Sequence, residues 1–233
     1  MDYSGRHVVI TGGTGALGTA IVGALLDAGA QCHVPYIAEA EAARFPHRQN
    51  ERVKLYPGVE LSDEAAVAKL YTDVSPLWAS IHLAGGFAMK SIADTGKSDL
   101  MGQIETNLVS AFLCSRAAVG AINKTTAGGR IVNVAARPAL EPRSGAGMTA
   151  YTASKAGVAA LTAALAEEVA KDGILVNAVA PSIMDTPANR KAMPKADFSA
   201  WPKVEEVAAT ILFLASPENK VTRGAIVPVY GKS

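Results

Sequence analysis

Charge and cysteine are both scarce in this sequence. Charged side chains make up 18% of the 233 residues, the formal net charge is +1, and the chain has two cysteines. A balanced charge provides no basic surface, which argues against nucleic acid or an anionic membrane as a partner. Cys32 and Cys114 lie far apart, and neither belongs to a His and Cys cluster with metal-ligand spacing. We therefore expect no metal site, and two reduced cysteines inside a cytoplasmic protein.

An uninterrupted hydrophobic run of membrane type is also missing. Residues 8–26 carry no charge, but five glycines interrupt them, and their pattern is that of a strand, a turn and a helix. Residues 1–6 lack the basic start and apolar centre of a signal peptide. Because 49% of the residues are hydrophobic, the chain can bury one substantial core. We expect a single domain over residues 1–233.

A glycine-rich turn near the start of the chain is the most informative feature. A β-branched run at 8–10 leads into four glycines within residues 12–18, and apolar residues then recur at helical spacing. Glycine lets the backbone take positive φ and approach a ligand, and the start of a helix attracts an anion. The natural anion is a dinucleotide pyrophosphate. The predicted contacts are Thr11, Gly12, Gly13, Thr14, Gly15, Ala16, Leu17 and Gly18.

Strands and helices alternate along the rest of the chain. We expect two proline-containing segments, 137–147 and 181–201, to be a loop and an irregular mobile lid. The pattern predicts an α/β Rossmann fold, in which helices flank one doubly wound, mostly parallel seven-stranded sheet with the ligand at its carboxyl edge. Beyond the first strand and helix, strands are predicted at 31–37, 52–56, 77–84, 129–135, 174–180 and 224–229, and helices at 65–74, 97–121, 150–171 and 204–215.

In a dinucleotide fold, a residue at the end of the second strand usually contacts the adenosine ribose. An acid there accepts a hydrogen bond from the 2′-OH of NAD, whereas a base binds the 2′-phosphate of NADP. Tyr36 stands at this position, where no acid is present. Glu39 and Glu41 follow, and they can equally be surface charges of a short helix. Three basic residues come later and favour NADP over NAD, although they too can be surface charges: Arg44, His47 and Arg48.

Tyr151 and Lys155 lie four residues apart on a predicted helix, so their side chains share one face. A phenol titrates near pH ~10, and a neighbouring ammonium favours the phenolate and brings the group toward acid–base work near neutral pH. Such a pair suits proton transfer to or from an alcohol oxygen while a nicotinamide transfers hydride. The same spacing also arises by chance on solvated helices. Asn107, inside an otherwise apolar helix, needs partners if buried, in a bracing or a catalytic role.

Five motifs are spread over nearly the whole chain. They are Thr11-Gly12-x-x-x-Ala16-x-Gly18, Leu83-Ala84-Gly85, Asn107-x-x-Ser110, Tyr151-x-x-x-Lys155, and Asn177-Ala-Val-Ala-Pro181 followed by Thr186. In this order they resemble the short-chain dehydrogenase/reductase family. The resemblance implies that Tyr151 is the general acid or base, that Lys155 lowers its pKa and holds the nicotinamide ribose, and that Asn107 anchors a water of the proton relay. It implies further cofactor contacts at Tyr36, Glu60, Leu61, Leu83, Ala84, Gly85, Gly86, Tyr151, Lys155, Pro181, Ile183 and Thr186.

Two departures from the family pattern stand out. Counting three residues past Asn133, the position of the family's catalytic serine is Ala136, and Ser144 or Thr149 in the following loop could replace it. His82-Leu83 stands in place of paired asparagines. Residues 134–140, 147–148 and 185–201 look like the dihydropteridine reductase branch, which also lacks that serine and reduces a quinonoid dihydropterin. That branch keeps an acid at the position of Tyr36, and this chain does not.

The sequence therefore predicts an NAD(P)H-dependent reductase of a small carbonyl, imine or quinonoid substrate. The alternatives are a dihydropteridine reductase proper and, because Ala136 has no hydroxyl, a dinucleotide-binding regulator without activity. Six loop residues suggest an apolar pocket, although they can equally be core: Phe87, Met89, Met148, Met184, Met193 and Trp201.

Small residues on the helices at 100–120 and 151–170 allow close helix packing. The resemblance implies that these helices pair across a homodimer or homotetramer; alternatively, the small residues face the sheet of their own subunit. The alanines concerned are Ala156, Ala159, Ala160, Ala163 and Ala164.

Overall fold

A parallel seven-stranded sheet forms the centre of the computed structural model, which describes residues 1–125 and 128–233. The strand order is β3-β2-β1-β4-β5-β6-β7, and every neighbouring pair is parallel. The order reverses between β1 and β4, which places the ligand crevice at the carboxyl ends of these strands. This confirms the predicted Rossmann class. The strands are β1 (His7–Thr11), β2 (Gln31–Tyr36), β3 (Val53–Pro57), β4 (Leu77–His82), β5 (Gly129–Val134), β6 (Ile174–Pro181) and β7 (Ile226–Val229).

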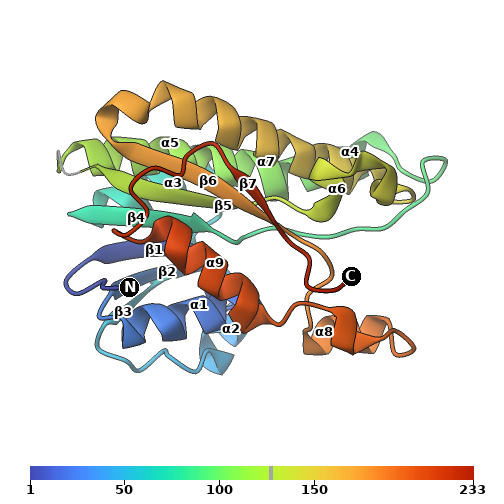
Figure 1. Cartoon of the computed structure of the whole chain (residues 1–233), viewed down its shortest axis with the longest axis horizontal. Helices are drawn as coiled ribbons and strands as arrows, with labels where there is room; N and C mark the ends of the chain where they lie inside the picture. Colours follow the sequence, from blue (N-terminus) through green and yellow to red (C-terminus); the bar gives the residue numbers. More distant parts are fainter. Residues whose placement is uncertain (126–127) are drawn as a thin grey trace.

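Helices cover both faces of the sheet (Figure 1). On one face α1 (Ala16–Asp27) packs against α9 (Val204–Ala215), with the short α2 (Glu39–Arg44) nearby. The other face is covered by α3 (Glu64–Thr72), α5 (Ser110–Asn123) and α7 (Thr149–Glu168). A 3₁₀ turn, η3 (Ala170–Asp172), follows α7.

Each face has its own hydrophobic core, and β1 contributes to both. Val8 and Ile10 belong to the core under α1 and α9, whereas Val9 between them belongs to the core under α3, α5 and α7. Successive strand side chains point to opposite faces, so a strand buried on both sides needs an unbroken apolar run. This explains the β-branched run at 8–10. Among the described residues, no helix combines the length and apolar character that crossing a membrane requires.

The helix predicted over 97–121 is interrupted. It consists of α4 (Lys97–Gln103), a π-helical turn η1 (Ile104–Val109) and α5. Within this turn the Asn107 side chain bonds to the backbone of Gly86 outside the helix. Ser110, the first residue of α5, donates its hydroxyl to the carbonyl of Thr106 in the turn over 2.6 Å. Single π-helical turns inside α-helices often mark functional sites. The apolar spacing alone gives no sign of the wider turn.

Both segments predicted as irregular contain helical turns. Residues 137–147 include α6 (Arg137–Leu140) and the 3₁₀ turn η2 (Pro142–Gly145). Residues 181–201 include α8 (Pro187–Ala192) and the 3₁₀ turn η4 (Phe198–Ala200). In both α6 and α8 a proline occupies the first turn, where its missing N–H breaks no helical hydrogen bond. These prolines begin helices, so the expectation of loop throughout was wrong. Strand β4 likewise ends at His82 rather than residue 84.

Candidate active site

The glycine-rich turn packs directly against the segment that follows β4. Gly12 has a φ of +67°, and a Cβ atom there would lie 2.8 Å from the backbone nitrogen of Ala84. A Cβ on Gly18 would overlap the carbonyl oxygen of Gly12. The backbone N–H of Leu83 donates to the carbonyl of Thr11 over 3.1 Å. Glycine is therefore required at both positions, and the predicted contacts at 11–18 and 83–84 meet at one place.

Helix α1 starts at this turn without a side-chain cap. Its N-cap is Gly15, and no side chain accepts a hydrogen bond from the first N–H groups of the helix. The first turn also carries no acidic side chain. Free N–H groups at the positive end of the helix dipole, beside a turn that a Cβ would fill, fit a pyrophosphate.

Acidic side chains approach the turn from the end of β2. A carboxylate oxygen of Glu41 lies 3.4 Å from the Thr14 hydroxyl. The Tyr36 hydroxyl donates to Glu39 over 3.0 Å. Both carboxylates come from the first turn of α2, which follows β2 closely. From the sequence, Glu39 and Glu41 could equally have been surface charges. In the structure they lie beside the expected position of the ribose.

The basic side chains of this region have other partners. The guanidinium of Arg44 donates to the carbonyl of Ala40, and that of Arg48 to the carbonyl of Ala43. His47 packs beside Gly23 of α1, where an added Cβ would lie 3.2 Å from its Nε2.

The loop after β3 reaches the end of β2 as well. The N–H of Val59 donates to the carbonyl of Tyr36 over 3.2 Å. The Glu60 carboxylate accepts from the backbone N–H of Ser62 over 3.2 Å and from its hydroxyl over 3.0 Å. Leu61 packs against the core under α3. Glu60 and Tyr36 thus border the same end of the crevice.

Tyr151 and Lys155 project from one face of α7. The Lys155 ammonium donates to the Val134 carbonyl at the end of β5 over 2.8 Å, and burial lowers its pKa to about 8. Burial also raises the pKa of Tyr151 to about 12. The structure differs here from the expected lowering of the phenol pKa, because the cause of the shift is burial, which disfavours the phenolate. At neutral pH the phenol keeps its proton.

Asn107 joins the β4 loop to α7. It is 1% exposed; its amide group donates to the Gly86 carbonyl over 3.0 Å and to the Ser154 hydroxyl over 3.1 Å, and its oxygen accepts from the Gly86 N–H over 2.9 Å. A Cβ on Gly85 would lie 2.6 Å from the Asn107 oxygen and 3.3 Å from the Lys155 Nζ. The structure therefore supports a bracing role for this side chain.

The third part of the crevice follows β6. Pro181 is buried at the end of the strand and Ile183 is 43% exposed. The Thr186 hydroxyl accepts from the Asn189 N–H over 3.2 Å and so caps α8. Pro181 ends β6, and Ile183 and Thr186 lie beyond it, at the edge of the sheet where α1 also begins.

Comparison with known proteins identifies the family. The sequence model described as short chain dehydrogenase matches residues 6–197. The chain belongs to the short-chain dehydrogenase family. It is 33% identical to galactitol 2-dehydrogenase of Rhizobium johnstonii, over 97% of this chain and 93% of that protein. Like its relatives, it is an oxidoreductase.

Solved structures agree with this assignment. The crystal structure of gox2181 superposes with a TM-score of 0.91 at 26% identity, covering 99% of this chain and 96% of the other. The structure of ElxO with NADP bound superposes with a TM-score of 0.86 at 25% identity, covering 97% of each chain.

This short-chain dehydrogenase has an alanine where a hydroxyl was expected. Ala136 is 5% exposed and its backbone is extended. Ser144 is exposed and donates its hydroxyl to the Glu141 carbonyl over 2.8 Å. Thr149 is exposed at the first position of α7. Within residues 1–125 and 128–233, neither hydroxyl hydrogen-bonds to Tyr151.

Three of the six predicted apolar pocket residues belong to the loops around Tyr151. Phe87 and Met89 are 63% and 67% exposed, and Met148 is half-buried. The N–H of Lys90 donates to the Gly147 carbonyl over 2.8 Å, which ties the two loops together. A cavity of about 300 Å³ lies between them, lined by Ala88, Lys90, Asp99, Met148, Thr149 and Ala150 among others. Ala150, which lines this cavity, directly precedes Tyr151 in the sequence, and the volume of the cavity suits a small ligand.

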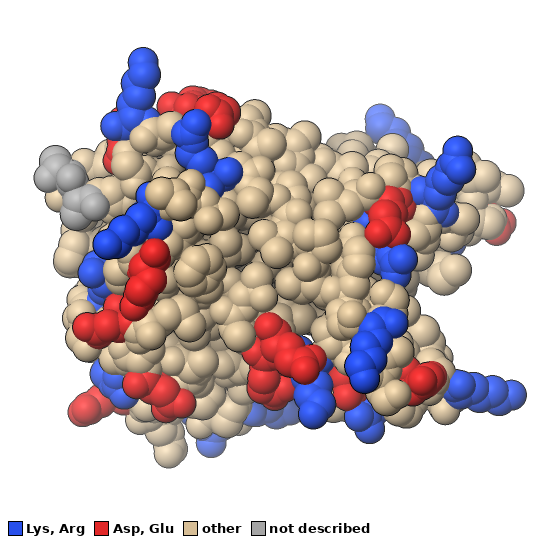
Figure 2. Space-filling view, viewed as in Figure 1, with Lys and Arg blue, Asp and Glu red and all other residues tan. Residues whose placement is uncertain are grey.

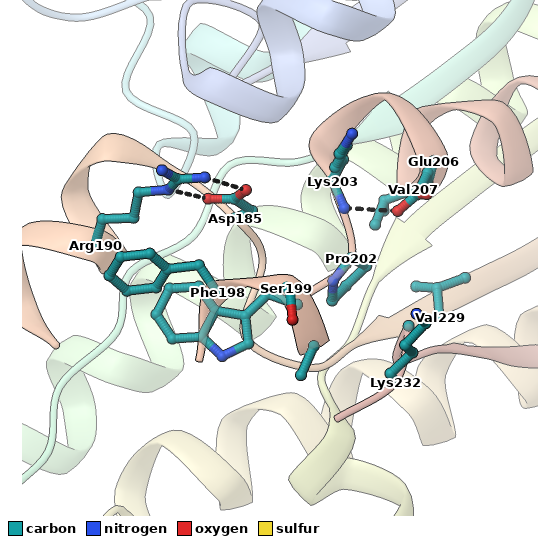
Figure 3. A pocket seen from close by; sticks show the side chains of 13 residues that line it. Asp185, Arg190, Phe198, Ser199, Pro202, Lys203, Glu206, Val207, Val229 and Lys232 are labelled. Atoms are coloured by element: carbon teal, nitrogen blue, oxygen red, sulfur yellow. Dashed lines mark hydrogen bonds and ion pairs between the residues drawn. The ribbon is translucent and has the colours of Figure 1, made fainter. Parts of the chain in front are cut away.

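The other three lie in or beside the segment at 181–201. Met184 packs against the core under α1, Met193 is half-buried, and Trp201 is 8% exposed against Phe198. Trp201 lines a separate cavity of about 690 Å³ (Figure 3). There the Arg190 guanidinium forms two hydrogen bonds to Asp185, of 2.6 and 2.8 Å. Tyr151 is not among the residues that line this cavity.

Sequence reasoning missed three contacts of the site. The ring of Phe87 packs on Tyr151, Ser154 receives a hydrogen bond from Asn107, and the Val134 carbonyl holds Lys155. The position of Ser154 directly before Lys155 was an available signal. The other two depend on loop and strand geometry, which no local pattern encodes.

Proposed function

We propose that this short-chain dehydrogenase is an NAD(P)H-dependent reductase with Tyr151 as its general acid. The observation that carries the proposal is the half-buried phenol on the same face of α7 as the buried Lys155, at the carboxyl edge that also holds the glycine-rich turn. The NADP bound to ElxO supports a nicotinamide dinucleotide. When bound, the dinucleotide supplies the hydride.

The proposed roles follow the geometry of the site. The Tyr151 hydroxyl donates its proton to the oxygen or nitrogen of the substrate as that atom gains charge. The Lys155 ammonium, held by the Val134 carbonyl, stabilises the resulting phenolate. Asn107 keeps Gly86 and α7 in register. The dinucleotide would lie along residues 11–18 and 83–86 and reach residues 181–186, with its adenosine toward Tyr36, Glu60 and Leu61.

We propose a small uncharged substrate with a carbonyl, imine or quinonoid group. Phe87, Met89 and Met148 make the entrance apolar. Two cations of the surrounding segments are already paired, Lys90 with Asp99 and Arg137 with Glu141, each over 2.8 Å. An anionic substrate that used either cation would have to displace its partner.

A second candidate is dihydropteridine reductase proper. Ala136 favours it, because a quinonoid dihydropterin already has a polarised ring and needs no hydroxyl to activate a ketone. The resemblance of residues 185–201 to that branch points in the same direction.

We propose that the protein works as a homodimer or homotetramer. Ala160, Ala163 and Ala164 on α7 are exposed rather than turned to the sheet, and Phe112 on α5 is 47% exposed. Figure 2 shows a broad surface over α7 on which charged residues are sparse. Such a surface suits close helix packing between copies. Light scattering should give a multiple of 24.0 kDa, and a monomer would contradict this proposal.

We propose a cytoplasmic location. Cys32 and Cys114 are buried and free, and burial raises the pKa of each thiol to about 12, so both stay protonated. Protein thiols persist in this form in reducing compartments.

Steady-state turnover with a substrate panel tests the function. Oxidation of NADPH and NADH would be followed with quinonoid dihydropterin, an uncharged aromatic ketone, a cyclic imine and a carboxylated ketone. We expect turnover with at least one uncharged member and little with the carboxylate. Nucleotide binding, measured by quenching of protein fluorescence, without turnover on any member would instead identify the regulator without activity.

A further inference from the structure

A chain of hydrogen bonds runs through the interior beneath the site. Tyr71 of α3 contacts Ser80 over 2.6 Å, and Ser80 contacts the Nε2 of His82 over 2.8 Å. The Nδ1 of His82 contacts the side-chain oxygen of Asn133 on the neighbouring strand over 2.7 Å. The amide nitrogen of Asn133 donates to the Thr162 hydroxyl of α7 over 2.9 Å. These five side chains are each at most 4% exposed.

The direction of every bond in this chain follows from its α7 end. The Thr162 hydroxyl donates to the Val158 carbonyl over 2.8 Å, so it accepts from Asn133. The Asn133 oxygen therefore faces His82, which must carry its proton on Nδ1. The Nε2 of His82 is left to accept from Ser80, and Ser80 accepts from Tyr71. Burial lowers the pKa of His82 to about 4, so this single arrangement holds at neutral pH.

The chain ends next to the group that holds Lys155. Val134, whose carbonyl accepts from the Lys155 ammonium over 2.8 Å, directly follows Asn133. Lys155 and Thr162 lie two turns apart on α7, so β5 binds this helix at two consecutive residues. His82 is the last residue of β4 and pairs with Asn133 in the sheet. Any shift of Asn133 thus moves the carbonyl that holds Lys155.

We propose that His82 is a positioning residue, which acts through Asn133 to hold the Val134 carbonyl against Lys155. This inference rests on the proposed function, in which the Lys155 ammonium stabilises the Tyr151 phenolate. It assigns a role to the histidine that stands where the family has an asparagine. The bond from Nδ1 to Asn133 carries the effect, whereas the bond of Nε2 to Ser80, and the bond of Ser80 to Tyr71, serve stability alone.

Two substitutions of His82 separate these bonds. The amide nitrogen of His82→Asn lies near the position of Nδ1 and can still donate to Asn133. The amide of His82→Gln reaches the position of Nε2 and leaves the Asn133 oxygen without its partner. Ser80→Ala is the matched control, since it removes a bond of Nε2 and keeps the bond to Asn133. Thr162→Val breaks the next link and serves if His82→Gln does not fold.

Titration of Lys155 by NMR in protein with ¹³C-labelled lysine is the readout, with Lys155→Met identifying its signal. Tyr151 shares the face of α7 with Lys155. Around His82, burial keeps Tyr71 and Cys114 protonated through this pH range by raising the pKa of each. We expect a pKa for Lys155 near the wild-type value in His82→Asn and Ser80→Ala. In His82→Gln and Thr162→Val it should fall by roughly half a unit or more, because the ammonium loses its acceptor.

A pKa of Lys155 that equals the wild-type value in all four variants would overturn the proposal. A shift of this pKa in Ser80→Ala as large as the shift in His82→Gln would overturn it too. Loss of thermal stability in all four variants is expected and is not the readout. The titration needs no substrate, so it is independent of the catalytic assignment. Unchanged turnover in Tyr151→Phe would refute the proposed function and leave the titration result intact.

Discussion

The ring of Phe87 stands edge-on to the ring of Tyr151, with 5.0 Å between the centroids and 81° between the planes. Phe87 is nevertheless 63% exposed, so its ring is open to a ligand. We expect a substrate that reaches the Tyr151 hydroxyl to contact this ring. Edge-to-face contact also restricts the Tyr151 ring to one orientation.

Phe87→Ala should therefore weaken binding of substrates that carry an apolar ring. We expect KM for such a substrate to rise about 2- to 10-fold, the value of one aromatic contact. KM for a small aliphatic carbonyl should change less. Steady-state kinetics with a matched pair of substrates measures the difference, and Phe87→Tyr should behave like the wild type. An equal rise for both substrates would exclude a direct contact.

The carboxylate of Glu41 beside Thr14 should act against the 2′-phosphate of NADPH. Glu41→Gln removes this charge. It should raise the ratio of the affinity for NADPH to the affinity for NADH by roughly 3- to 10-fold, the effect of one unit charge at a solvated site. Fluorescence titration with both nucleotides gives the ratio. Glu51→Gln is the control, because Glu51 precedes β3 and so lies at the amino ends of the strands, away from the crevice. A ratio that stays constant would place the ribose elsewhere.

Reduction should slow as the pH rises through about 8. The pKa of Lys155 is lowered to about 8 by burial, so its ammonium is present below that pH and lost above it. The pKa of Tyr151, about 12, keeps the phenol protonated throughout. A profile of kcat between pH 6 and 10 measures this decrease. Arginine does not lose its proton in this range, so the residual kcat of Lys155→Arg should not decrease above pH 8. A flat wild-type profile would remove Lys155 from the mechanism.

Ala136→Ser should extend the enzyme to simple ketones. The site is buried with an extended backbone that serine adopts without strain. A hydroxyl there would donate to a ketone oxygen, and we expect the rate to rise about 10-fold or more. Reduction of a quinonoid substrate should change little. Ala139→Ser, three residues further on, is the matched control. Equal rates on ketones before and after the change would mean that this position does not face the substrate.

The sequence was sufficient to predict the fold. The β-branched run at 8–10, the glycines after it and the alternation of strand and helix led to the observed sheet, with most strand ends correct to within two residues. What it could not show was local. Pro138 and Pro187 begin short helices, because proline is tolerated in a first turn as well as in a loop.

The structure brings residues of separate motifs together, Gly12 against Ala84, and Asn107 and Lys155 against Gly85. Their roles in binding and catalysis stay predictions. The pKa of Tyr151 was not predictable, because it depends on burial, which spacing along a helix does not reveal. The contact of Glu41 with Thr14 also depends on how α2 lies against the turn.

Turnover by Tyr151→Phe tests the central claim most directly. The substitution removes the phenolic proton and keeps the ring that packs against Phe87. Affinity for NADPH and NADH should stay within about 2-fold of wild type, while kcat for the best substrate should fall roughly 10²- to 10⁴-fold, the contribution of a positioned general acid. Turnover within about 2-fold of wild type would contradict the account and show that another group supplies the proton.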